Sequence, residues 1–132
     1  MNATEIFKKL RLDESKKNLL INAPQEFMEL LSGVTYNTVF IPTDASSYDY
    51  VQVFASTQRE LEMLLKPIAT AGKYDCLFWI CYPKGGGKIK SDLKRDKIWD
   101  AFTTINLRPV TQIAIDETWS ALRGRPSEMV GK

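Results

Sequence analysis

The apolar run that begins at Cys76 and ends at Pro83 restricts the fold of this chain more than any other segment. A run of this length is typical of one buried strand and is far shorter than the roughly 20 residues of a membrane-spanning helix. Leu77 to Tyr82 is apolar on both faces of such a strand, so other layers must cover both of its sides. The run therefore predicts the central strand of a parallel sheet with helices on either side.

Hydrophobic spacing and turn residues divide the rest of the chain into short elements. Pro24 suits the first residue of a helix because it lacks an N–H group, and Ser91 suits a helix N-cap. The predicted helices cover Thr4–Arg11, about 24–33, a stretch from a cap at Ser56–Thr57 to about Ile68, and about Ser91–Ile105. The predicted strands cover 19–21, 38–41, 50–55, 77–82, 110–115 and 119–123.

The order of these elements predicts one α/β domain over residues 1–132, a normal length for a single domain. We expect an open, mostly parallel, Rossmann-like sheet flanked by helices. The last two strands are separated only by Asp116–Thr118, which predicts a C-terminal antiparallel hairpin at one edge of the sheet. The tail from about Gly124 is expected to be flexible.

The chain contains no histidine, which excludes Ser-His-Asp triads, Cys-His dyads and zinc sites with histidine ligands. Cys76 and Cys81 lie five positions apart in one predicted strand, so they point to opposite faces and cannot bridge each other. We interpret them as reduced, buried thiols and predict no metal site. The N-terminus lacks the apolar stretch of a secretory signal, so we expect a cytoplasmic protein without a membrane segment.

A glycine-rich, basic loop follows the predicted central strand. Residues 84–97 contain six basic and two acidic residues, a local charge of +4. Glycine N–H groups, lysine side chains and a following helix N-terminus are the groups that bind phosphates and carboxylates. The predicted anion site consists of Lys84, Gly85, Gly86, Gly87, Lys88, Lys90, Ser91 and Arg95. The alternative is a solvated loop whose lysines serve solubility.

The turn after the first predicted strand, Asn22–Glu26, argues against a nucleotide cofactor bound in the usual way. Such sites use a glycine-rich turn there, whereas this turn has no glycine and Pro24 removes an N–H donor. The loop 84–91 is not a Walker A motif either, because Tyr82 and Ile89 stand where that motif needs glycine and serine or threonine. We therefore expect no cofactor, neither adenosylmethionine nor NAD.

Other polar and aromatic groups favour structural roles. Asp92, Asp96 and Asp100 recur at helical spacing and are expected to form a salt-bridged helix surface with Lys88, Arg95 and Lys97. The three tryptophans, Trp79, Trp99 and Trp119, are expected in the core. Only Tyr82 and Trp119 are candidates for stacking on bases, so we do not expect a nucleic-acid partner. The catalytic residues are unknown.

Four segments resemble a family of small, mostly bacterial proteins classed as a domain of unknown function. They are LLINAPQEF (19–27), YDYVQVF (48–54), LFWICYPKGGGKIKSDLKRDKIWD (77–100) and IAIDETWSALRGRP (113–126). This resemblance implies no activity. The element order is also similar to a shortened class I methyltransferase sheet with its terminal antiparallel hairpin, which is a statement about architecture.

The sequence thus favours a non-catalytic, cofactor-free module that binds a small anion or a protein partner through the basic loop. The first alternative is a divergent or degenerate methyltransferase-like enzyme. A purely structural or regulatory subunit is the second.

Overall fold

The computed structural model describes residues 3–85 and 89–131. The helices are α1 (Ala3–Leu10), α2 (Gln25–Glu29), α3 (Gln58–Ile68) and α4 (Arg95–Thr104), with short 3-10 turns η1 (Pro42–Asp44) and η2 (Ser127–Met129). The strands are β1 (Asn18–Ile21), β2 (Tyr48–Phe54), β3 (Gly72–Pro83), β4 (Leu107–Ala114) and β5 (Trp119–Pro126). In the part of the chain that is described, none of the helices is long and apolar enough to cross a membrane.

The strands form one mixed sheet in the order β1-β2-β3-β5-β4, with β3 in the centre as expected. β1, β2 and β3 run parallel, whereas β5 is antiparallel to both of its neighbours, β3 and β4. The α/β sheet flanked by helices and the terminal hairpin are therefore confirmed, and the sheet is mixed rather than purely parallel, because β5 is antiparallel to its neighbours. The reason is that β5 returns through the short turn after β4 and lies between β4 and β3.

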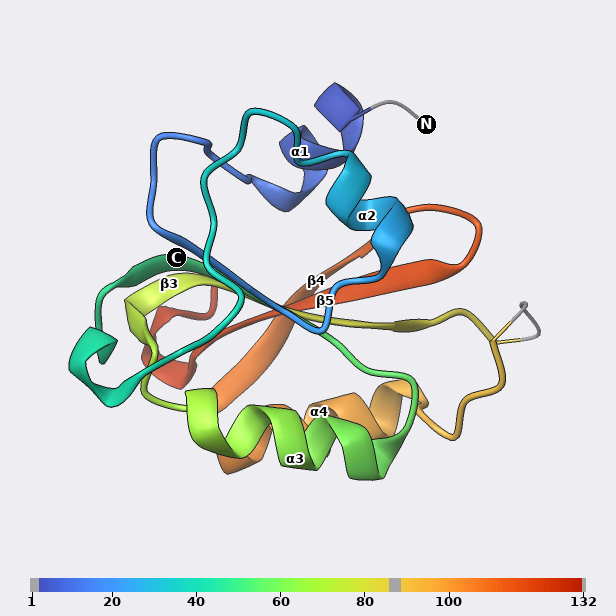
Figure 1. Ribbon diagram of the computed structural model, residues 1–132. Coiled ribbons are helices and arrows are strands. Elements are labelled where there is room, and N and C mark those ends of the chain that lie inside the picture. Colours follow the sequence, from blue (N-terminus) through green and yellow to red (C-terminus); the bar gives the residue numbers. More distant parts are fainter. Residues whose placement is uncertain (1–2, 86–88, 132) are drawn as a thin grey trace.

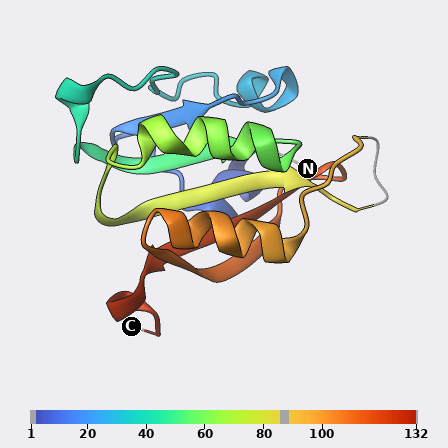
Figure 2. The same cartoon turned by 90° about the horizontal axis from the view of Figure 1, so that it is seen from below.

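The helices cover the sheet in two layers (Figure 1). On one face, Ile6 and Leu10 of α1 and Phe27 of α2 pack with Trp79 of β3. On the other face, α3 and α4 lie side by side, as Figure 2 shows, over Phe78 and the other side chains of that face. The buried run of β3 therefore contacts a helical layer on both sides, which agrees with its apolar composition.

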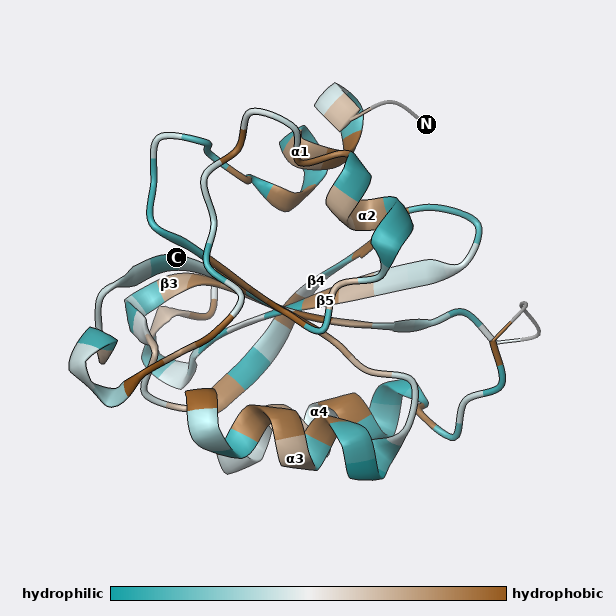
Figure 3. Cartoon of the chain, viewed as in Figure 1, coloured by the Kyte–Doolittle hydropathy of each residue, from teal (hydrophilic) through white to brown (hydrophobic). Residues whose placement is uncertain are grey.

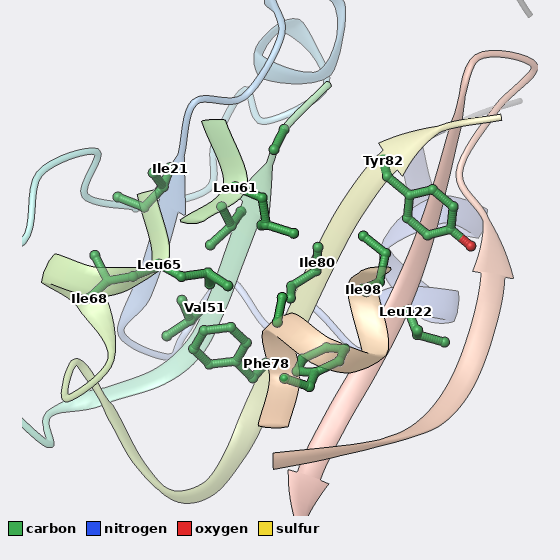
Figure 4. Packing of buried hydrophobic residues seen from close by; sticks show 14 of the residues in the cluster. Ile21, Val51, Leu61, Leu65, Ile68, Phe78, Ile80, Tyr82, Ile98 and Leu122 are labelled. Atoms are coloured by element: carbon green, nitrogen blue, oxygen red, sulfur yellow. The ribbon is translucent and has the colours of Figure 1, made fainter. Parts of the chain in front are cut away.

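The close view in Figure 4 shows how β3 supplies the α3–α4 face. Phe78, Ile80 and Tyr82 alternate along the strand and point to the side from which Leu65 of α3 and Ile98 of α4 approach. The alternation of a strand accounts for this pattern. In Figure 3 brown, apolar residues lie where strands cross near the centre, and the turn between β4 and β5 is teal.

Several predicted boundaries need correction. Residues 38–41 form no strand: only Asn37 makes a bridge, to Leu19, and Val39 is 69% exposed. α4 begins at Arg95 rather than near Ser91. β5 continues to Pro126, beyond the point at which the sequence suggested a flexible tail.

Candidate functional site

The connections that follow β1 and β2 cross the sheet in opposite directions. After β1 the chain passes through α2 on one face and then runs outside β1, where Asn37 pairs in parallel with Leu19. After β2 it passes through α3 on the opposite face toward β3. The two connections thus leave neighbouring parallel strands in opposite directions, which defines a topological switch point. In α/β sheets, ligands bind outside the carboxyl ends of the strands at this place.

A pocket of about 340 Å³ lies at this switch point. It opens between the residue that follows β1 and the beginning of α3. Its lining combines polar groups with an apolar wall from α3, which is the usual composition of small-molecule sites. The lining residues are Asn22, Thr57, Arg59, Glu60, Met63 and Leu64.

Asn22 shapes the turn that follows β1. Its φ of 60° lies in the left-handed region, which asparagine enters more readily than most other residues with a side chain. Its side-chain amide donates a 2.8 Å hydrogen bond to the carbonyl oxygen of Phe54, the last residue of β2. Asn22 thus makes the left-handed turn for which the sequence lacks a glycine, and it joins the carboxyl ends of β1 and β2.

The first turn of α3 is held by side chains that cap its free N–H groups. Thr57 is the N-cap, and its hydroxyl accepts a 3.1 Å hydrogen bond from the backbone N–H of Glu60. One carboxylate oxygen of Glu60 accepts a 2.8 Å bond from the N–H of Ser56. A reciprocal arrangement of this kind fixes the Glu60 side chain, which lines the pocket. The N–H of Gln58 donates a 2.8 Å bond to Asp92.

The bond between Gln58 and Asp92 places part of the predicted anion loop next to this site, because Asp92 belongs to the segment that follows β3. Lys84 follows β3 directly, and its N–H donates a 2.8 Å bond to the carbonyl of Thr118 in the β4–β5 turn. Gly85 and Lys90 are exposed. Three of the predicted residues, Gly86, Gly87 and Lys88, lie outside the described residues.

Ser91 does not cap α4. Its hydroxyl accepts a 3.0 Å bond from the N–H of Leu93, and the N-cap position of α4 is Lys94, which makes no side-chain cap. The helix dipole on which the predicted site relied therefore starts at Arg95, four residues later. Anion binding by this loop stays a prediction.

Within the described residues, the acidic residues of the loop and α4 make no ion pair with Arg95 or Lys97, and Lys88, the third expected partner, lies outside those residues. Asp92 precedes α4, and it caps α3 instead of sharing a helix face with Asp96 and Asp100. Among the described residues, the ion pairs within 4 Å join Lys17 to Asp44, Lys73 to Asp49 and Arg125 to Asp75. Asp116 is a turn residue as predicted, since it accepts bonds of 2.8 Å from the N–H groups of Thr118 and Trp119.

Trp79 and Trp119 are buried, as predicted, whereas Trp99 is not. Trp99 is 48% exposed on α4, although it was predicted in the core, because its helix position faces away from the sheet. Tyr82 and Trp119, the two candidates for base stacking, are buried. Burial raises the pKa of the Tyr82 hydroxyl, and the nearby guanidinium of Arg95 opposes that shift. Tyr82 therefore stays protonated at neutral pH.

The two cysteines are unpaired and lie on opposite faces, as predicted. Burial raises the pKa of the Cys76 thiol to about 12 and also raises the pKa of the Cys81 thiol. Both are therefore neutral at physiological pH. Within residues 3–85 and 89–131, no three His, Cys, Asp or Glu side chains form a group that suits a metal ion.

The chain matches no family model and no curated protein sequence. Among solved structures it is similar to a SAM-dependent methyltransferase from Aquifex aeolicus, with a TM-score of 0.64 and 10% identity, covering 92% of this chain and 88% of that one. A putative type 11 methyltransferase from Sulfolobus solfataricus gives 0.61 and 13%, covering 88% of each chain. Magnesium protoporphyrin IX methyltransferase from Synechocystis, with bound SAH, gives 0.59 and 7%, covering 95% and 83%.

At these identities the likeness shows the architecture. It agrees with the similarity to a methyltransferase sheet that the element order suggested. It contradicts the leading interpretation from the sequence, a non-catalytic binding module, because the structures that share the fold support the methyltransferase-like alternative instead.

Proposed function

We propose that this chain is a divergent methyltransferase-like enzyme that binds adenosylmethionine at the switch point between β1 and β2. The observation that carries the proposal is the pocket itself, which opens at the carboxyl ends of these strands in a sheet of methyltransferase architecture. The proposal departs from the sequence expectation of no cofactor. That expectation rested on the missing glycine, whose left-handed conformation Asn22 adopts.

The residues at the pocket fit a nucleoside. Glu60 lines the pocket, and within the described residues its bonds from Ser56 use only one carboxylate oxygen, which leaves the other to accept a bond from a ribose hydroxyl. Met63 and Leu64 offer an apolar wall for a planar base, and Met63 is 68% exposed. A volume of about 340 Å³ lies in the lower part of the range of small-molecule pockets.

Dinucleotide sites carry an acidic residue about 20 positions after the first turn that binds the ribose, and the corresponding residue of this chain is not at the pocket. Asp44 stands at about that spacing, but it pairs with Lys17, which precedes β1, at a distance of 3.4 Å. It therefore lies at the amino end of β1, away from the pocket. This leaves Glu60, which comes from the first turn of α3, as the acidic residue of the site.

Bound adenosylmethionine would supply an electrophilic methyl group on a sulfonium. The protein's part is then to bind and orient the two reactants and to keep competing water out, which accounts for much of the acceleration in group transfer. The turn at Asn22 is rigid because its side chain is bonded to Phe54. The α3 cap likewise holds Glu60 through Ser56, so both sides of the pocket are preorganised.

The test is binding of S-adenosylhomocysteine and adenosylmethionine, followed through backbone amide shifts and calorimetry. We expect saturable binding with the largest shifts at Asn22, Thr57 and Glu60. Glu60→Gln should weaken binding by about 10-fold or more, because the amide keeps an acceptor for Ser56 but loses the charge that holds a hydroxyl.

Glu62→Gln is the matched control. Glu62 lies on the same helix but lines the groove toward α4, where it accepts a 3.3 Å bond from the side chain of Gln58. Its replacement should leave binding unchanged. Absence of saturable binding at about 1 mM of either compound, or equal losses in the two variants, would refute the proposal.

A further inference from the structure

A second cavity, of about 580 Å³, lies at the opposite end of the sheet. Its walls come from the beginning of β3, the end of α4 and the segment that follows β5. Figure 2 shows that the C-terminal segment lies at the end where β3 begins, far from the carboxyl end of that strand. This cavity is therefore separate from the switch-point pocket and is not explained by the proposed methyltransferase site.

The floor of this cavity is apolar. Phe78 is buried beneath it, and Cys76, Ile105 and Leu107 are partly buried against the same core. Because burial raises the pKa of the Cys76 thiol to about 12, its side chain contributes a neutral surface. An apolar group of a ligand would gain free energy by covering this floor.

Two residues at the rim hold uncommon backbone conformations. Asp75 has a φ of 58° and Asn106 a φ of 62°, both in the left-handed region. Asp75 is held there by a bidentate ion pair with Arg125, whose Nε and Nη2 donate hydrogen bonds of 2.9 and 2.8 Å to its carboxylate. Such conformations persist where surrounding contacts enforce them, and they cluster at binding sites.

In the part of the chain that the structure describes, the charges around this cavity leave one cation and one anion without an opposite charge. Lys73 pairs with Asp49 at 2.8 Å, and Asp75 pairs with Arg125. Arg108 donates from Nε to the hydroxyl of Ser127 at 3.1 Å and contacts no carboxylate within the residues that the structure describes.

Glu128 is the corresponding anion. It accepts a hydrogen bond from the hydroxyl of Tyr74 and, in the same described residues, has no basic partner within 4 Å. The bond from Tyr74 lowers the pKa of Glu128, so the carboxylate is charged at neutral pH. A guanidinium side chain is positively charged in proteins.

We propose that this cavity binds a free amino acid with a large apolar side chain. The ammonium group contacts Glu128, the carboxylate contacts the terminal nitrogens of Arg108, and the side chain covers the floor formed by Phe78 and Ile105. A guanidinium, a carboxylate and an apolar surface match the carboxylate, the ammonium group and the side chain of such a zwitterion. A ligand with only one charge would leave Arg108 or Glu128 without an oppositely charged partner.

The experiment uses three probes with the same ring, namely L-phenylalanine, 3-phenylpropionate and 2-phenylethylamine, titrated into the full chain and followed by amide shifts. L-phenylalanine should bind saturably, with shifts at Cys76, Asn106 and Ser127. Each analogue should bind about 10-fold more weakly or worse, because it lacks one charge. Equal binding of the three probes, or no saturable binding of L-phenylalanine at about 10 mM, would overturn the proposal.

Two variants separate the two contacts. Arg108→Gln should remove the preference for L-phenylalanine over 2-phenylethylamine, and Glu128→Gln should remove the preference over 3-phenylpropionate. Both side chains are exposed, so the melting temperature should change little. Lys8→Gln, an exposed change on α1, is the control and should alter neither preference. Preferences that survive in both variants would contradict the assignment, and adenosylmethionine binding near Asn22 should be the same in all of these proteins.

Discussion

The indole N–H of Trp79 donates a 2.9 Å hydrogen bond to the carbonyl oxygen of Leu10, 69 positions earlier in the chain. Leu10 is the last residue of α1, where carbonyl groups lack partners within the helix. Trp79 lies in the middle of β3 and is 1% exposed. One side chain of the central strand therefore both fills the core and supplies a hydrogen bond to the end of the N-terminal helix.

Replacing Trp79 should separate these two contributions. Trp79→Phe keeps an aromatic ring but leaves the buried carbonyl of Leu10 without its donor, so it should cost about 1–3 kcal/mol of unfolding free energy. Trp79→Ala also opens a cavity and should cost about 3–5 kcal/mol. Trp99→Ala, at an exposed position, should stay within about 0.5 kcal/mol of the parent. Urea unfolding gives all three values, and a similar loss for Trp79→Ala and Trp99→Ala would contradict this account.

Gly124 allows α4 to approach β5. A Cβ atom at this position would lie 2.5 and 2.6 Å from two ring carbons of Phe102. We therefore expect Gly124→Ala to destabilise the protein by about 1–3 kcal/mol in thermal or urea unfolding. Gly85→Ala, where an added Cβ meets no atom within 4 Å, should be close to neutral. The smaller side chain of Phe102→Leu should recover part of the loss in the double variant, and a purely additive double variant would mean that the two positions do not clash.

The ion pair between Asp75 and Arg125 should make the free energy of unfolding depend on pH in the acidic range. The hydrogen bond from Arg125 lowers the pKa of Asp75 below its usual value of 3.8. A carboxyl group whose pKa is lower in the folded state stabilises fully above its unfolded pKa, and this contribution disappears as the pH falls through the folded pKa. The stability difference between the parent and Asp75→Asn should thus be largest at neutral pH and should shrink below about pH 4. An Asp75 pKa, measured by NMR, that does not rise in Arg125→Gln would contradict this cause.

Thiol reactivity should report folding in this protein. Burial raises the pKa of Cys76 to about 12, and Cys81 is buried beside the side-chain amide of Gln52. Because only the thiolate reacts, both should react with a disulfide reagent at pH 8 far more slowly in the folded chain than in urea. Cys76 should react first, since it is partly exposed. Rapid reaction of two thiols without denaturant would show that the β3 region opens readily.

The sequence correctly predicted those elements whose own residue pattern determines where they lie. Leu77 to Tyr82 is apolar on both faces and does form the central strand, and Thr57 does cap α3. The segment 38–41 is β-branched and apolar but forms no strand, because pairing depends on neighbours that its local sequence does not contain. The antiparallel position of β5 between β3 and β4 is also a tertiary property that alternation cannot reveal.

The candidate site was only partly predictable. The sequence predicted an anion site in the loop after β3, since charge and glycine content are visible in the chain itself. The switch point depends on the order of strands and on which face each helix covers, so Glu60 looked like an ordinary residue of an amphipathic helix. One local signal did exist: Asn22 ends the first predicted strand, and asparagine is a residue that replaces glycine in left-handed turns.

Asn22 has two roles that substitutions can separate, a left-handed backbone and a side-chain bond to Phe54. Asn22→Gly keeps the backbone freedom and loses only the bond, so it should cost about 0.5–1.5 kcal/mol in urea unfolding. Asn22→Ala loses the bond and strains the turn as well, so its cost should be larger by about 1 kcal/mol. If the turn also forms one side of a nucleoside pocket, Asn22→Ala should weaken S-adenosylhomocysteine binding more than Asn22→Gly, because only alanine disfavours the conformation that brings the backbone to the ligand. Equal stabilities for the two variants would mean that the left-handed turn relaxes at little cost, and the backbone of Asn22 would then no longer support the proposed cofactor site.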